Sequence, residues 1–587
     1  MSREDLIDVA TGEVSADVVI KDGKLVNIHT REIYTADVAI KGKRIAYVGE
    51  AGHTVGNKTK VLSAKGKYIV PGLIDPHIHV GESYLTIDQL ARALILHGTT
   101  AVATDFYEIF VVSGPRGVKF ALSEGKKTPL KIFLVLMQQI MKLEHLGTYP
   151  RSEKQMANEM EGMLHWPETL GINEPPLAPI LTRDPIVMKL IRSAWKEKKI
   201  LVGHYPFSDK KKLNAYLTTG ANSDHESKTE KEALDKIRLG MRIMIREGSP
   251  SPDLAKVIKI LANHEVESRY FMLCSDDEDL LDIVRKGHMD FKVRKAIKEG
   301  IDPVTAIQMA TINVAEYLGI DRDLGSITPG KIGDILIVDK LSDLKISTVI
   351  ADGKTVAQNG RYIAKGDSRG TPTFMTRTVR LKKPLKPADF EVKSKENKQK
   401  AKVRVIGVED GSLIRKWKTD TLLVENGRII PDVGRDIVKA AVVECHRKTG
   451  RIGIGFISGL GLKGGAIACT HNHLYQNLVV VGTSDKDMSF AANKLADLGG
   501  GLLATKNGRV LDQLPMPFGG VMTNAPYTDA YHKLERLGST VKRLGVNYES
   551  PFLTLAFITL PAIPEAAITD KGLVDVSKQE IVDLIIS

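Results

Sequence analysis

Between residues 71 and 329 the chain alternates short apolar runs with amphipathic stretches of helical length. This alternation is typical of strands and helices that follow one another in a parallel barrel. Eight runs fit strands, and each leaves room for a helix after it: LIDPHIH, TAVATD, KIFLVLM, LGINE, ILVGH, NSDHE, RIMIREGS and YFMLCSDD. Apolar residues three and four apart in KEALDKIRLGMRIMI and VRKAIKEGIDPVTAIQMATINVAEYLGI indicate helices. The pattern therefore predicts an α/β fold built on a TIM (β/α)8 barrel.

The two flanks of the predicted barrel carry a different pattern. Residues 1–70 contain the β-rich runs ADVVI, KLVNI, ADVAI, RIAYVG and KYIV, separated by turn pairs such as Asp22-Gly23. A similar pattern returns in residues 330–375 with DILIV, STVIADG and TVAQNGRYI. We expect both flanks to pair into one small β-sandwich domain, with residues 71–329 inserted between them as the barrel.

The last part of the chain divides into a basic segment and a further domain. Eleven lysines and arginines lie between Arg377 and Arg404, and residues 376–400 read as a solvated basic connector. Residues 401–587 combine strands such as LVVVGT with the helix-like SFAANKLADLGG, which predicts a C-terminal α/β domain. Its stretch GRIGIGFISGLGLKGG lacks the G-x-x-x-x-G-K-S/T spacing, so we interpret these glycines as turns rather than a phosphate loop.

Composition and charge exclude several classes of protein. The chain has 587 residues, 43% hydrophobic and 26% charged, and it lacks any uninterrupted apolar run long enough to span a bilayer. Its N-terminus has early acidic residues and no apolar signal region, and its three cysteines show no C-x-x-C pairing. We therefore expect a cytoplasmic protein without a membrane partner. The net charge of +12 is concentrated in the connector, without interleaved aromatics, which argues against a nucleic-acid partner.

Imidazoles and carboxylates occur where the predicted strands end. The carboxyl ends of barrel strands meet at one face, so these side chains are expected to converge. His77 and His79 are two residues apart, and such residues of an extended chain point to the same side. The predicted metal ligands are His77, His79, Glu174, His204, His225 and Asp276.

A lone histidine at a strand end is more often structural than catalytic, because a backbone group easily satisfies a neutral imidazole. Six polar residues in the expected order favour a metal site instead, since the alternative requires several buried charges without partners. Four imidazoles and two carboxylates suit Zn, Mn or Fe(II).

The chain resembles the amidohydrolase superfamily and, within it, the adenine deaminases. The segments PGLIDPHIH, SDHESKTEKEALDKIRLGMRIMIREGS, LGSITPGKIGDILIVD, VVVGTSDKDM and LPMPFGGVM carry the resemblance over almost the full length. It implies a binuclear divalent metal site, with Mn or Fe as the usual metals and Zn also compatible. In that site His77 and His79 hold one ion, His204 and His225 the other, Glu174 bridges them, and Asp276 contacts a metal and the nucleophile.

The resemblance implies hydrolysis of a C–N bond in a nitrogen heterocycle, with adenine and water giving hypoxanthine and ammonia. Asp276 is the expected catalytic proton carrier. Glu247 is a second catalytic candidate and Glu226 a substrate-binding one, although a structural salt bridge at Arg246 or Glu247 is an equal alternative. Superfamily members commonly self-associate, so we expect a homo-oligomer, with a dimer as the base rate.

Three departures from the family pattern affect the expected pocket. His79-Val80-Gly81-Glu82-Ser83 replaces His-Ile-Glu-Ser-Ser, Asp105-Phe106-Tyr107-Glu108 replaces Asp-Pro-His-Glu, and Asn472-His473-Leu474-Tyr475-Gln476 replaces Ala-His-Asp-Ser-His. The predicted substrate-binding residues are Glu82, Ser83, Phe106, Tyr107, Glu108 and Glu226. Retained ligands with altered neighbours leave open another substrate, namely an N6-substituted purine or a cyclic amide, lactam or ureide. A catalytically silent binding protein is a further alternative.

Overall fold

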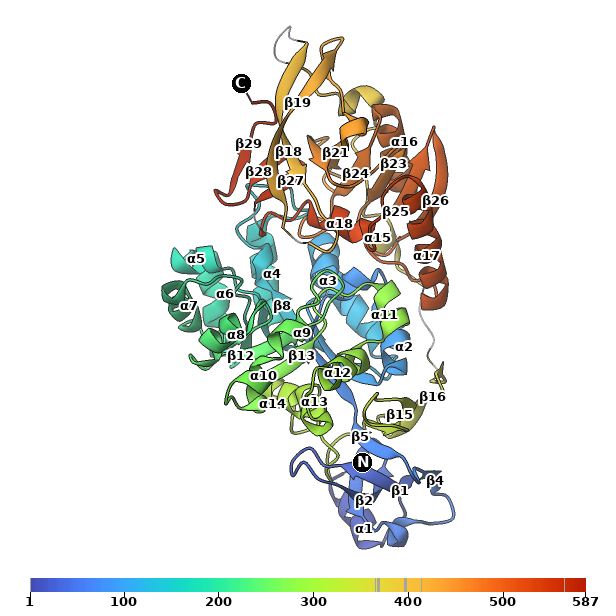
Figure 1. The fold of residues 1–587 in the computed structure, drawn as a ribbon. Helices are drawn as coiled ribbons and strands as arrows, with labels where there is room; N and C mark the ends of the chain where they lie inside the picture. The colour runs from blue at the N-terminus through green and yellow to red at the C-terminus, as the bar shows by residue number, and fades with distance from the viewer. Residues whose placement is uncertain are drawn as a thin grey trace.

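The computed structural model describes residues 2–364, 366, 370–394, 399–412, 414–563 and 565–586. Figure 1 shows three parts in a row: a β domain at the N-terminus, a barrel in the middle and a C-terminal domain over the opposite end of the barrel. No described helix combines the length and apolar character needed to cross a bilayer. Cys274, Cys445 and Cys469 are all buried and unpaired, as their spacing predicts.

The barrel contains parallel strands in the predicted order. They are β6 (Leu73–Ile78), β7 (Thr99–Thr104), β8 (Lys131–Met137), β9 (Thr169–Asn173), β10 (Ile200–Val202), β11 (Ser223–Asp224), β12 (Arg242–Arg246) and β13 (Phe271–Cys274). β6 to β10 form one sheet and β11 to β13 another. Parallel bridges between Leu201 and Ala221 and between Ile78 and Asp276 join the two sheets, so the ring closes. The predicted TIM barrel is confirmed.

Helices cover the outside of these strands. They are α2 (Ile87–Leu96), α3 (Tyr107–Gly125), α4 (Glu153–Met163), α5 (Leu177–Leu181), α6 (Pro185–Lys196), α7 (Lys210–Leu217), α8 (Glu230–Ile237), α9 (Leu254–Val257), α10 (Ile260–Asn263), α11 (Leu280–Lys286), α12 (Met289–Lys298), α13 (Pro303–Met309) and α14 (Ile312–Leu318).

Two predicted helical runs are shorter in the structure than their periodicity indicates. α8 ends at Ile237, and Gly240 has a φ of +82°, which stops the helix before β12 begins. The following helical run divides into three. Gly300, with a φ of +98°, and Asp302, which caps α13 ahead of Pro303, lie at the first break, and Thr311, with φ of −140° and ψ of −92°, lies at the second. Apolar periodicity alone does not detect these backbone breaks.

The N-terminal domain is assembled from both flanks of the barrel. Its elements are α1 (Glu4–Thr11), β1 (Val18–Val26), β2 (Ile33–Lys41), β3 (Arg44–Gly49), β4 (Lys60–Ser63), β5 (Tyr68–Pro71), β14 (Ile335–Val338), β15 (Ile346–Ala351), β16 (Lys354–Gln358) and β17 (Arg361–Tyr362). β5 pairs antiparallel with β14, and this pairing joins the flanks into one nine-stranded sheet. Ile20 and Val38 from one flank share a buried core with Ile335 and Ile350 from the other.

The C-terminal domain holds a second nine-stranded sheet and a small three-stranded one. Its elements are α15 (Thr373–Thr376), β18 (Lys400–Gly407), β19 (Lys416–Glu425), β20 (Arg428–Ile429), β21 (Ile437–Val443), β22 (Ile452–Ser458), β23 (Ala466–Cys469), β24 (Leu478–Gly482), α16 (Asp485–Asp497), β25 (Gly501–Lys506), β26 (Arg509–Pro515), α17 (Tyr527–Arg543), α18 (Pro551–Phe557), β27 (Ala566–Thr569), β28 (Gly572–Asp575) and β29 (Glu580–Val582). Gly459, Gly461 and Gly465 have positive φ angles, which fits the interpretation of that stretch as turns.

The basic segment before this domain is not a solvated connector along its described length. Val379, Leu385 and Phe390 are buried in the core of the C-terminal domain, together with Ala441. Their apolar contacts anchor the segment, while its lysines and arginines gave the sequence its solvated character. Residues 395–398 of the predicted connector lie outside the described residues.

Candidate metal centre and active site

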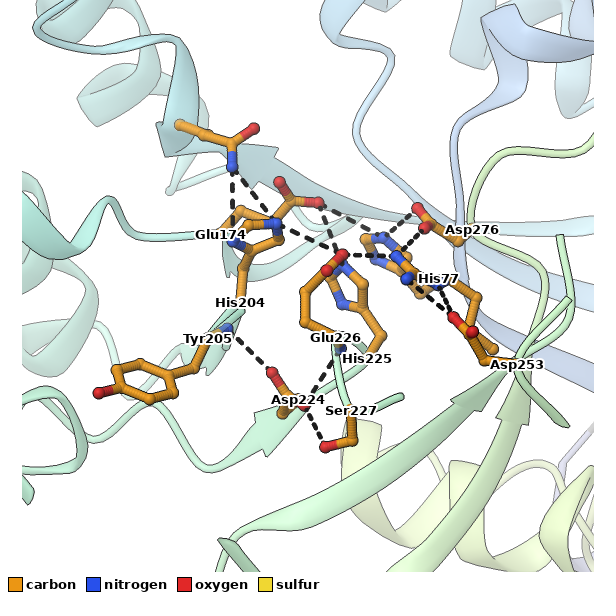
Figure 2. Close-up of polar contacts among 12 residues, drawn as sticks. His77, Glu174, His204, Tyr205, Asp224, His225, Glu226, Ser227, Asp253 and Asp276 are labelled. Atoms are coloured by element: carbon orange, nitrogen blue, oxygen red, sulfur yellow. Dashed lines mark hydrogen bonds and ion pairs between the residues drawn. The ribbon is translucent and has the colours of Figure 1, made fainter. Parts of the chain in front are cut away.

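Five barrel strands deliver the predicted ligands to one place. His77 lies in β6 with His79 just beyond it, and Glu174, His204 and His225 follow β9, β10 and β11. Asp276 follows β13 and completes the set. Figure 2 shows His77, Glu174, His204, His225 and Asp276 turned toward one another. The structure thus brings together all six residues that the sequence predicts as ligands.

The backbone at two of these ligands is strained. Glu174 has a φ of +50° and Asp276 a φ of +64°, in the left-handed region that residues with a Cβ rarely adopt. Such strain persists only where surrounding contacts hold it, and it concentrates at functional sites. The turn at each strand end aims the carboxylate into the barrel mouth.

Glu174 occupies the centre of the ligand set. Its Oε1 lies 3.5 Å from His77 Nε2, 3.4 Å from His79 Nε2 and 3.7 Å from His225 Nε2. Asp276 Oδ1 lies 3.3 Å from the Nε2 atoms of both His77 and His79. His77 Nε2 forms no hydrogen bond despite these buried neighbours. Nitrogen and oxygen donors that face one another at such spacing, without a shared proton, fit a metal ion between them.

His204 and Glu226 form the more open side of the centre. His204 Nε2 lies 3.5 Å from Glu226 Oε1, and His225 Nε2 lies 3.8 Å from the same oxygen. His204 and Glu226 are half-buried, whereas the other ligands are buried. Ligand atoms of His204, His225 and Glu226 all lie within 4.8 Å of one another. Glu226, predicted as a substrate-binding residue, thus lies beside the predicted ligands His204 and His225.

The Asp224 carboxylate holds the backbone next to the predicted ligands His204 and His225, which follow β10 and β11. Buried Asp224 pairs with Lys236 at 2.6 Å. It also accepts hydrogen bonds from the backbone nitrogens of Tyr205 at 2.9 Å and Glu226 at 3.1 Å (Figure 2). These bonds fix the backbone next to His204 and His225. Supporting contacts of this kind set how ligands are oriented. Sequence reasoning did not single out Asp224, although it directly precedes the ligand His225.

His79 has its own partner on the side away from the centre. Its Nδ1 lies 3.0 Å from Asp105 Oδ2, and Asn173 donates to the same carboxylate oxygen at 3.2 Å. Burial alone would lower the pKa of His79, but the Asp105 carboxylate raises that pKa well above its usual range. Asp105 fixes the ring so that Nε2 faces Glu174.

Arg246, the last residue of β12, lies at the candidate centre, although the sequence suggested only a structural salt bridge for it. Its guanidinium is fully buried and pairs with Glu226, with Asp276 Oδ2 at 2.9 Å and with Asp253 Oδ2 at 3.0 Å. Burial alone would raise the pKa of Asp276, but the adjacent imidazoles of His77 and His79 and the charges of His225 and Arg246 hold it well below its usual range. The contact with Arg246 fixes Asp276 Oδ2, and Oδ1 faces His77 and His79.

Glu247 does not fit its predicted catalytic role. Its Oε1 pairs with Lys295, and its Oε2 accepts a hydrogen bond from Leu254 N at 3.2 Å. Both oxygens thus hold barrel helices in place, which is the structural alternative considered for this residue. The neighbouring Arg246 occupies the inward position because consecutive strand residues point to opposite faces.

The predicted substrate-binding residues separate into two groups. Ser83 and Phe106 do not reach the metal centre: the Ser83 hydroxyl donates to Val80 O at 2.7 Å within its own turn, and Phe106 lines a hollow with Phe120 and Phe518. Tyr107 does approach the centre, since its ring meets that of His79 edge-on at 5.6 Å. The aromatic residues of the second departure therefore point in different directions.

Glu82 meets the C-terminal domain. Glu82 Oε2 lies 3.1 Å from His471 Nε2, Glu82 Oε1 lies 3.4 Å from His473 Nε2, and Tyr107 donates to Oε1 at 3.3 Å. Burial by itself would raise the pKa of Glu82, but the charges of His471 and His473 lower it to about 2. Glu82, Tyr107 and His473 each come from a different one of the three departures from the family pattern. The three departures thus meet in one buried group of side chains.

Glu108 is buried against Gly81. A Cβ added at Gly81 would lie 2.3 Å from Glu108 Cδ, so glycine leaves the space that this carboxyl fills. Both carboxyl oxygens of Glu108 lack hydrogen-bond partners. Burial, followed by the charges of Asp105 and Glu82, raises the pKa of Glu108 to about 8. The first two departures are therefore physically coupled.

A barrel with imidazoles and carboxylates at its strand ends defines an amidohydrolase, and the model of the Amidohydrolase family matches residues 68–356. The model described as the Adenine deaminase C-terminal domain matches residues 412–580. Adenine deaminase from Moorella thermoacetica is 39% identical, covering 100% of this chain and 98% of its own length. Those from Clostridium botulinum strain 657 and Staphylothermus marinus are 39% and 36% identical, covering 99% of this chain and 97% and 98% of their own lengths. The chain belongs to the adenine deaminase family.

Proposed function

We propose that this protein is a metal-dependent deaminase that converts adenine and water to hypoxanthine and ammonia. The observation that carries the proposal is the convergence of three imidazole nitrogens on one carboxylate oxygen, Glu174 Oε1, at 3.4 to 3.7 Å. Family members of matching length that bear the name adenine deaminase support the choice of substrate.

The donor set supports a pair of divalent ions. We propose that His77 and His79 hold one ion, His204 and His225 the other, and that Glu174 lies between them. Mn or Fe is our proposed metal, and Zn is compatible with the same nitrogen and oxygen donors. When bound, such ions supply a water of lowered pKa and a Lewis acid.

Asp276 is the proposed proton carrier. Arg246 holds its Oδ2, which leaves Oδ1 facing the centre to accept a proton from the attacking water. The oxygen of that water adds to the ring carbon that carries the amino group. Asp276 then returns the proton to the amino nitrogen, the C–N bond breaks, and ammonia leaves. The atoms of adenine and water are all accounted for in hypoxanthine and ammonia.

Glu226 and Glu108 are our proposed contacts to the ring. Glu226 lies at the open side of the centre beside His204. Glu108 carries two buried oxygens without partners, which a ring N–H can satisfy. The changed residues Gly81, Glu82 and Tyr107 lie next to His79 and Glu108, and this favours a second candidate substrate, an N6-substituted purine or a cyclic amide.

The test is ammonia release by Mn-loaded protein from adenine, N6-methyladenine, guanine and a hydantoin-like ring. We expect turnover of adenine, and Asp276→Asn should reduce kcat by about 100-fold or more while metal content stays near normal. If the protein released ammonia or opened the ring of another compound but did not deaminate adenine, the second candidate substrate, an N6-substituted purine or a cyclic amide, would replace adenine. Near-normal activity of Asp276→Asn would contradict the proton-carrier role, and silence on the whole panel would contradict the proposed reaction.

A further inference from the structure

A second group of donor atoms lies where the barrel meets the C-terminal domain. It consists of Glu82 and Asp277 from the barrel and His473 from the C-terminal domain. Their ligand atoms all lie within 4.8 Å of one another, and the three residues are 0%, 7% and 5% exposed. Neither of the predicted metal pairs uses any of these residues.

The atoms of this group face one another without sharing a proton. His473 Nε2 lies 3.4 Å from Glu82 Oε1 yet forms no hydrogen bond, and Asp277 Oδ1 has no hydrogen-bond partner either. The main centre has the same arrangement, since His77 Nε2 lies 3.3 Å from Asp276 Oδ1, also without a hydrogen bond. Buried polar atoms without a hydrogen-bond partner lower the stability of the fold, unless a further group such as a cation binds between them.

The hydrogen bonds behind His473 determine which form of its ring faces the group. Tyr107 donates its hydroxyl hydrogen to Glu82 Oε1 at 3.3 Å, so its oxygen accepts from His473 Nδ1 at 3.0 Å. The Nδ1 atom then carries the proton, and Nε2 presents a lone pair toward a carboxylate. A carboxylate and a lone pair repel each other, and a cation between them removes the repulsion. At His79 a polar group also lies behind Nδ1, namely Asp105 Oδ2 at 3.0 Å, as an ion pair rather than a hydrogen bond.

The charge around the group also favours a cation. Three buried carboxyl groups lie close to the interface between the barrel and the C-terminal domain (the seam), namely those of Glu82, Asp277 and Glu108. Among the described residues, neither a lysine nor an arginine forms an ion pair with any of the three. Glu82 contacts the imidazoles of His471 and His473, whereas no ion pair is found for Asp277 or Glu108 among the described residues. A divalent cation held by Glu82 and Asp277 would supply positive charge to this group.

We propose that Glu82, Asp277 and His473 bind a third divalent cation, which joins the barrel to the C-terminal domain beside the catalytic pair. One imidazole and two carboxylates suit Mn, Fe(II) or Zn. The ion lies at a seam between domains, so its binding also stabilises the docking of one domain on the other.

The experiment counts bound ions rather than turnover. Metal-free full-length protein is titrated with Mn²⁺, and binding is followed by loss of the free-ion electron paramagnetic resonance signal. We expect three equivalents in the wild type and two in His473→Phe, which removes the ligand nitrogen but keeps a ring between Tyr107 and Phe557. Two equivalents in the wild type, or three in His473→Phe, would overturn the proposal.

Two further variants keep the result interpretable. Tyr107→Phe removes only the hydroxyl behind His473 and should weaken the third ion by about 10- to 100-fold with two tight ions retained. His446→Gln is the matched control, because the ring of this half-buried C-terminal histidine hydrogen-bonds to the carbonyl oxygens of Thr378 and Gln476, away from the proposed site, and the variant should still bind three ions. Unchanged affinity in Tyr107→Phe would count against the site. Adenine that lowers the number of bound Mn²⁺ from three to two would also contradict it, since the ring would then occupy the group.

The number of bound ions tests the third cation site, and ammonia release tests the proposed reaction, so the two proposals can be refuted separately. An inactive protein that binds three ions would contradict the proposed reaction but not the third site. An active protein that binds two would do the reverse.

Discussion

The sharpest test of the site geometry replaces Arg246 by methionine. The side chain is 1% exposed and is the cation shared by Glu226, Asp253 and Asp276. Methionine fills much of the same volume but leaves these three carboxylates without their partner. Removing one member of a buried ion pair costs about 3–5 kcal/mol. Bound metal compensates Asp276 and Glu226 in part, so we expect about 3 kcal/mol for the metal-loaded protein.

Activity should fall along with stability. The 2.9 Å contact from Arg246 fixes Asp276 Oδ2, and without it the carboxylate can rotate away from the position that serves proton transfer. Displacement of a catalytic group by about 1 Å costs roughly 100-fold in rate. We therefore expect kcat of Arg246→Met to fall by about two orders of magnitude. Stability is measured by denaturant unfolding, and kcat by ammonia release at saturating adenine and Mn²⁺.

The neighbouring residue supplies a matched control. Glu247→Gln loses the ion pair with Lys295 but keeps an oxygen for Leu254 N, so kcat should stay within about threefold of the wild type. The reasoning would be refuted if Glu247→Gln lost activity while Arg246→Met kept it. That outcome would return the catalytic role to Glu247 and make the Arg246 contacts purely structural.

Three further substitutions test the barrel, a helix and the domain interface. Gly171→Ala places a Cβ 1.9 Å from Ile200 O between β9 and β10, and it should lower the free energy of unfolding by about 3 kcal/mol or more. Wild-type stability in denaturant would show that the two strands can move apart freely. Gly538→Ala, inside α17 with open space around it, should stabilise by about 0.5–1 kcal/mol, and an unchanged or lower Tm would contradict this. Asp570→Asn loses one of two acceptors for Thr148 N and Oγ1, at 2.8 and 2.6 Å, and should cost about 1–3 kcal/mol; limited proteolysis at the seam should speed up, and an unchanged cleavage rate would argue against the contact.

Much of the candidate metal centre could be predicted because its proposed ligands occupy local positions in the sequence. An apolar run followed by a histidine or a carboxylate identifies both a strand and its carboxyl end, and parallel strands place those ends on one face. His204 after ILV and Asp276 after FMLC needed only this rule. The family resemblance added the pairing of the ligands, which spacing alone does not give.

The neighbours of the ligands could not be predicted in the same way. Arg246 and Glu247 are adjacent and both charged, and the choice between them depends on which face of β12 points into the barrel. The basic segment was interpreted from its charge, whereas the burial of Phe390 depends on a core built from distant strands.

The sequence by itself determined the barrel, the composite N-terminal domain and the order of the six ligands, because each follows from periodicity or from a short motif. Only the tertiary structure decided how the three departures relate. Tyr107 and His473 are 366 residues apart, yet they hydrogen-bond at 3.0 Å next to Glu82. No local pattern encodes such a contact, because it forms only when the C-terminal domain packs on the mouth of the barrel and excludes water from the seam.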